Sequence, residues 1–127
     1  MTPDGSASEA HDGPLSPSEL TVLESTLLPA LERHHLRLLA HGLRTLQAIA
    51  GRRGGAVPPA ATIATWCRQH PRIADDPAFQ LAFAAQLDAA GAQLEALAGG
   101  RGCPPLALTL EDLCSWAEER ARQRLVC

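Results

Sequence analysis

Residues 77–98, PAFQLAFAAQLDAAGAQLEALA, decide the fold class. Apolar side chains recur in this segment every three or four residues, at Phe79, Phe83, Leu87, Ala90, Leu94 and Leu97. This spacing matches the 3.6-residue period of an α-helix and predicts a buried stripe along one side. Asp76 can cap the helix and Pro77 fits its first turn, while glycines follow Ala98. We therefore predict a helix from Pro77 to Ala98.

A second stripe on the same helix contains only alanine, at Ala78, Ala82, Ala85, Ala89, Ala92 and Ala96. Its alternating spacing of four and three residues is that of a heptad repeat, and small side chains let another helix approach closely. We expect this alanine seam, defined by these six residues, to contact a second helix. That helix belongs either to the same bundle or to a partner, which includes a second copy of the chain.

Three further regions carry helical signals. The first covers residues 16–50, with Ser16 as its N-cap and a kink or break expected at Pro29. Shorter helices are expected over residues 59–69 and 109–124, bounded by proline and by a capping threonine. No segment has the pattern of a strand, so the predicted class is all-α.

The predicted architecture is a single-domain bundle of four to five helices over residues 15–127, since 127 residues make one domain. Hydrophobic residues make up 46% of the chain, and the scarcity of aromatic residues, with two Phe, two Trp and no Tyr, favours helices over strands. Residues 1–14 are small, polar and rich in Pro and Gly, which predicts a disordered tail.

The setting predicted for the chain is soluble and cytoplasmic. Four cysteines show no Cys-x-x-Cys spacing, and the N-terminus lacks the basic and apolar regions of a signal peptide. No apolar run approaches the roughly 20 residues that span a bilayer, so no membrane partner is expected.

Basic residues are concentrated in residues 33–53, which contain five arginines and no acid, although the net charge of the chain is −3. A helical projection places a basic face opposite an apolar one, and we extend this face to the two arginines that follow: Arg33, His34, Arg37, His41, Arg44, Arg52 and Arg53. This face is either plainly solvated, or a binding surface for an acidic protein or for a nucleic acid. A net-acidic chain without aromatic residues between its arginines argues against nucleic acid.

Three polar residues are predicted to be buried: His35, Cys67 and His70. His35 projects into the apolar face made by Leu31, Leu38 and their neighbours, and a packed core histidine is the simplest interpretation. Cys67-x-x-His70 is the one Cys/His pair with ligand-like spacing, but zinc needs further ligands that no second close pair supplies. His34 and His41 lie about 10.5 Å apart along a helix, which is too far for one metal. No metal and no cofactor are therefore expected.

The stretches LLPALERHHLRLLAHGLRTLQAIAG, HPRIADDPAFQLAFAAQL and PPLALTLEDLCSWAEERA resemble small uncharacterised all-helical proteins of cyanobacteria. The likeness covers residues 16–124 and rests on the general residue pattern and on the order of the predicted helices, without a shared catalytic motif. It implies an intracellular setting in a photosynthetic bacterium, with no activity and no functional residues to carry over.

The functional hypothesis is a non-enzymatic helical module that docks a protein partner through the basic face or through the alanine seam. Nucleic-acid binding through residues 33–53 is the first alternative. A small enzyme or metalloprotein centred on Cys67, His70 and His35 is the second.

Overall fold

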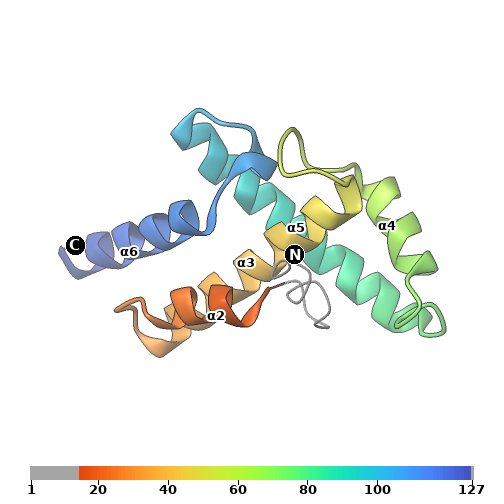
Figure 1. The fold of residues 1–127 in the computed structure, drawn as a ribbon, viewed down its shortest axis with the longest axis horizontal. Coiled ribbons are helices and arrows are strands. Elements are labelled where there is room, and N and C mark those ends of the chain that lie inside the picture. Colours follow the sequence, from red (N-terminus) through yellow and green to blue (C-terminus); the bar gives the residue numbers. More distant parts are fainter. Residues whose placement is uncertain (1–14, 127) are drawn as a thin grey trace, which may run out of the picture. The chain divides into compact units, whose positions relative to one another are not determined.

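The computed structural model describes residues 15–126, and the regular elements in that range are all helices (Figure 1). Its elements are α2 (Pro17–Glu24), α3 (Ala30–Ala50), α4 (Ala60–Gln69), α5 (Pro77–Arg101), the 3₁₀ helix η1 (Pro105–Ala107) and α6 (Leu110–Val126). No strand occurs between residues 15 and 126, and the all-α class is confirmed. The predicted tail over residues 1–14 lies outside the described residues.

The helix starts follow their capping signals. Ser16 accepts the N–H of Glu19 at 3.1 Å, and the Glu19 carboxylate accepts the N–H of Ser16 at 3.0 Å, which completes a capping box. Thr109 and Asp112 make the same reciprocal pair at the start of α6, at 3.1 and 2.9 Å. Asp76 accepts the N–H of Phe79 at 3.0 Å at the start of α5.

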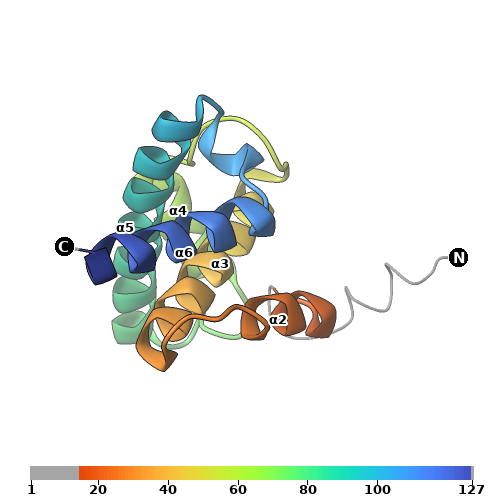
Figure 2. The same ribbon diagram turned by 90° about the vertical axis from the view of Figure 1, so that its left-hand side faces the viewer.

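Of the kink or break predicted at Pro29, the structure has the break: α2 ends at Glu24, and the chain turns before α3 begins (Figure 2). The end of α5 differs from the prediction. The α5 helix continues three residues past Ala98 and ends where Gly102 adopts a left-handed φ of 70°. Residues Gly99 and Gly100 are tolerated inside the last turn, and Gly102 is the residue that stops the helix.

The chain divides into two compact units, with the boundary inside α3 between Arg44 and Thr45. The first unit contains α2, α3 up to Arg44, and α6. Its buried apolar residues are Leu15, Leu23, Leu28, Leu36, Leu39, Ala40, Leu43, Leu110, Leu113 and Ala117.

The second unit comprises residues 45–108 and is built on the contact of α4 with α5. Its buried apolar residues are Leu46, Ile63, Cys67, Leu87, Leu94, Leu97, Ala98, Leu106 and Leu108. The side chain of Gln47 donates to the carbonyl of Leu106 at 2.9 Å, which ties the end of α3 to η1. A Cβ at Gly91 would lie 2.8 Å from a methyl of Val57, so glycine there allows the loop to pack tightly on α5.

None of the described helices combines the length and the apolar character needed to cross a membrane.

Candidate functional site

The alanine seam lies on an open side of α5. All six of its residues are exposed, so no other helix of the second unit covers it. The opposite side of α5 carries the predicted buried stripe, where Leu87, Leu94 and Leu97 are between 0 and 5% exposed. Phe79 departs from that stripe because it lies in the first turn and is 47% exposed, although its ring stacks on Phe83 at 5.7 Å.

The two flanks of the seam differ in charge. In a heptad repeat with the alanines at the a and d positions, one flank carries Leu81, Asp88 and Glu95, each placed one residue before an alanine. The other flank carries Phe79, Gln86 and Gln93, which bear no charge. All six flanking residues are exposed, and Leu81 reaches 76%. Neither Asp88 nor Glu95 forms an ion pair with another described residue, so both carboxylates face solvent beside the seam.

The predicted basic face meets the acids of α2. Arg44 donates to Glu19 at 2.9 Å, Arg37 pairs with Glu24, and the Arg33 guanidinium lies 3.6 Å from Glu24. The side chain of Arg44 is only 10% exposed, and those of Arg33 and Arg37 are about one-third exposed. The prediction of a solvated face is therefore wrong for Arg44, because α2 folds back along this side of α3 and brings its carboxylates to the guanidinium groups.

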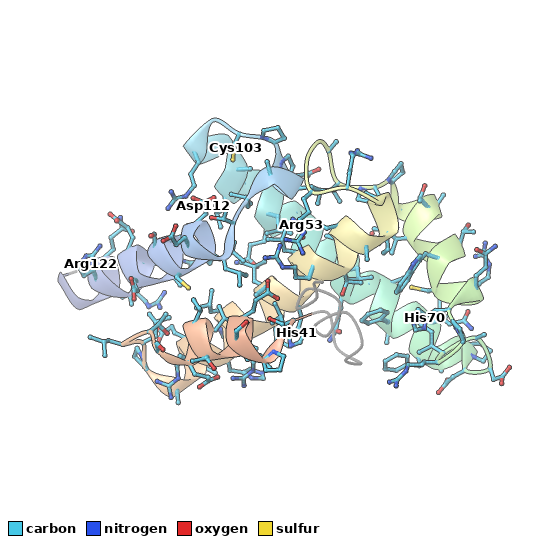
Figure 3. The ribbon with its side chains drawn as sticks, viewed as in Figure 1. His41, Arg53, His70, Cys103, Asp112 and Arg122 are labelled. Carbon is cyan, nitrogen blue, oxygen red and sulfur yellow. The ribbon has the colours of Figure 1, made fainter. Side chains whose placement is uncertain are left out.

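The remaining residues of the basic face differ in environment. His34 is exposed, with its Nδ1 3.4 Å from Arg37. His41, which is labelled in Figure 3, is partly buried. Burial lowers the pKa of His41 below its usual value of 6.5, and the positive charge of Arg37 lowers it further. Arg52 and Arg53 belong to the second unit and are exposed, and Arg52 donates to the carbonyl of Gly54 within its own loop at 2.8 Å.

The prediction that His35 is buried is wrong. His35 is exposed, and so are its apolar neighbours Leu31 and Leu38, at 65 and 51%. Leu36 and Ala40 are buried instead, at 1 and 0%. The buried side of α3 is rotated toward the arginines relative to the predicted one, because α2 covers the helix on that side. Sequence reasoning therefore missed an exposed leucine–histidine face, made by Leu27, Leu31, His34, His35 and Leu38.

Cys67 and His70 lie in different environments on α4 and at its end. Cys67 is 1% exposed, and burial raises the pKa of its thiol, with a further contribution from the negative charge of Asp88. His70 is partly exposed and its ring packs against Trp66, with centroids 4.8 Å apart and the planes tilted by 47°. Its Nδ1 accepts the N–H of Arg72 at 3.3 Å. No group of three or more His, Cys, Asp or Glu residues in the described range is arranged to hold a metal ion.

A family model described as NDH complex assembly factor CRR9 matches residues 15–124. The match spans most of the chain and all the elements described above, so the chain belongs to this family. The resemblance to small helical proteins agrees with this assignment but had named no such family. No curated protein and no solved structure matches the chain.

Proposed function

We propose that this member of the NDH complex assembly factor CRR9 family acts as a non-enzymatic protein-interaction module in the assembly of an NDH complex. The description of the family supports a role in bringing protein subunits together. We choose the alanine seam of α5 because all six of its alanines are exposed. We assign this seam as the main docking surface.

The shape of the seam suits a helix of the partner. Alanine at every a and d position lets two helix axes approach more closely than leucine would, and such contacts depend on shape complementarity along their length. The seam extends from Ala78 to Ala96 on α5, which corresponds to about 27 Å of helix. A partner helix that presents small residues of its own fits this surface best.

The charges beside the seam define the partner further. Asp88 and Glu95 lie on one flank without an ion pair in the described chain, so a partner helix with Lys or Arg at the facing positions gains complementary contacts. A second copy of this chain fits less well. In an antiparallel pair of heptad helices the like flanks meet, which would bring acids against acids. The proposed partner is therefore a different protein.

The basic face on α3 supports a second contact of the same class. Three of its arginines already bind carboxylates of the chain itself, which favours an acidic protein segment over nucleic acid as a further ligand. Nucleic-acid binding through residues 33–53 would show the steep salt dependence of phosphate neutralisation. A cytoplasmic setting in a cyanobacterium, as expected from the sequence, is part of this proposal.

A complementation experiment tests the proposed function. Deleting the gene in the organism that encodes it should lower the amount of assembled NDH complex on native gels, and the wild-type gene should restore it. Ala89→Arg should fail to restore it, because a long cation then stands in the seam and repels a basic partner. Ala61→Arg, a matched change at an exposed alanine of α4, should restore it. Full restoration by Ala89→Arg would refute the assignment of the seam.

A further inference from the structure

We propose that the leucine–histidine face of α3 is a second docking site, and that its ligand is an amphipathic helix of a protein partner with carboxylates beside its apolar stripe. The class of ligand rests on the proposed function. The site itself rests on three properties of residues 27–38: the exposure of their leucines, their spacing on the helix, and the sign of the groups beside them.

Exposure of large apolar side chains is concentrated at this face. Leu27, Leu31 and Leu38 are 96, 65 and 51% exposed. They account for three of the six large apolar residues that are exposed in the described chain. Single exposed leucines are common on protein surfaces, but a contiguous group of them marks an interaction site.

The spacing makes the face continuous. Leu31, His34, His35 and Leu38 stand at i, i+3, i+4 and i+7 of α3, so they share one side of the helix along about 10.5 Å. Leu27 lies in the connection just before α3 and adds a further exposed leucine close to the start of this helix. This arrangement provides anchor points for an apolar helix that lies along the face, as in helix-in-groove recognition.

The polar side chains beside the leucine–histidine face indicate which sign of charge the ligand carries. The nearby carboxylates are already bound within the chain, Glu24 by Arg33 and Arg37, and Glu32 by Arg124. An approaching helix therefore meets two imidazoles and the partly exposed guanidinium of Arg37. These groups complement carboxylates on the ligand. A second copy of the chain would instead bring histidine and arginine against their own copies.

The alanine seam and the leucine–histidine face thus select ligands of opposite charge. The first has free carboxylates beside small residues, and the second has imidazoles and a guanidinium beside leucines. A protein with both surfaces can hold two different partner segments, and linking two weak contacts raises the overall affinity.

Titration of the ¹⁵N-labelled full-length chain with two synthetic helical peptides tests the second site. Both peptides carry leucine at i, i+3, i+4 and i+7, and they differ only in having Glu or Lys beside the leucines. We expect the Glu peptide to shift the amide signals of residues 27–38 and to bind about tenfold more tightly than the Lys peptide. Leu31→Glu should weaken binding of the Glu peptide by about tenfold or more, because a buried leucine contact is lost. Leu81→Glu, the same change at an exposed leucine of α5, should leave it unaffected.

Three results would overturn this inference. The first is equal or tighter binding of the Lys peptide, and the second is a set of shifted amides outside residues 27–38. The third is a stronger response of the same amides to phosphatidylglycerol vesicles than to the Glu peptide, which would make the face a lipid-binding one. None of these results depends on the alanine seam, so the proposed function would stand or fall separately in the complementation experiment.

Discussion

The carboxylate of Glu19 links the start of α2 to Arg44 in α3: one oxygen accepts the N–H of Ser16 at 3.0 Å, and the other accepts from the Arg44 guanidinium at 2.9 Å. The two side chains are only 25 and 10% exposed, in the same order. This ion pair is therefore better shielded from solvent than the other ion pairs described above, and it joins α2 to α3.

Glu19→Gln should lower the free energy of unfolding by about 1–3 kcal/mol, because the amide can keep the capping contact while a mostly buried guanidinium loses its counter-charge. The matched control is Glu119→Gln, which removes the exposed ion pair with Arg122, whose side chains are 60 and 70% exposed. That change should cost less than about 0.5 kcal/mol. Urea unfolding monitored by circular dichroism measures both, and equal losses in the two variants would contradict the role given to Glu19.

The orientation of α3 can be tested by truncating two leucines. Leu36→Ala should cost about 2–5 kcal/mol of stability, since Leu36 is 1% exposed. Leu31→Ala should cost less than about 0.5 kcal/mol, since Leu31 is 65% exposed. The helical projection of the sequence alone predicts the larger loss at Leu31. Midpoints of urea unfolding for the two variants therefore decide between the two orientations.

His41 should titrate below its usual pKa of 6.5, because partial burial and the charge of Arg37 both disfavour the imidazolium. Its pKa is lower in the folded than in the unfolded chain. The resulting stability is present above about pH 6.5 and is lost as the pH falls through the folded pKa. NMR titration of the imidazole measures this pKa directly. Arg37→Gln should raise it and Arg122→Gln should leave it unchanged, whereas a value at or above 6.5 in the wild type would show that the site is misdescribed.

Cys67 should titrate above its usual pKa of 9.0, mainly because it is buried and further because of the charge of Asp88. The neutral thiol is the favoured form in the folded chain. Its contribution to stability is therefore complete below about pH 9 and is lost as the pH rises through the raised pKa. A ¹³C NMR titration of the Cys67 Cβ follows the thiolate. Asp88→Asn should lower the pKa by a part of the shift, and Glu95→Gln should not; a pKa at or below 9.0 in the wild type would contradict the burial of this thiol.

Much of the helix layout could be predicted from the sequence because its signals are local. Capping residues such as Ser16, Asp76 and Thr109 act within three residues of themselves, and prolines act at their own position. The sequence does not decide whether Pro29 kinks the helix or ends it, because the outcome depends on which residues pack on either side of the proline. The continuation of α5 to Arg101 depends on Gly102, whose conformation the sequence does not specify.

The side of α3 that is buried could not be predicted, because leucines lie on more than one side of this helix. Leu31 and Leu38 support one buried side, whereas Leu36 and Leu43 support another, and periodicity allows both. The second side is the buried one in the structure, because Glu19 and Glu24 of α2 bind arginines of α3 that lie 25 and 13 residues away in the chain. The spacing of the alanine seam was visible in the sequence, but its exposure is a property of the tertiary fold.

Site-specific photocrosslinking tests the central claim most directly. A photoreactive amino acid at position 89, in the alanine seam, should crosslink a subunit of the NDH complex in cells, identified by mass spectrometry of the crosslinked peptide. The same group at position 61, on the exposed side of α4, should not. A subunit of the complex captured from position 89 alone is the result that the account predicts. Capture from both positions alike, or of no subunit from position 89, would contradict it.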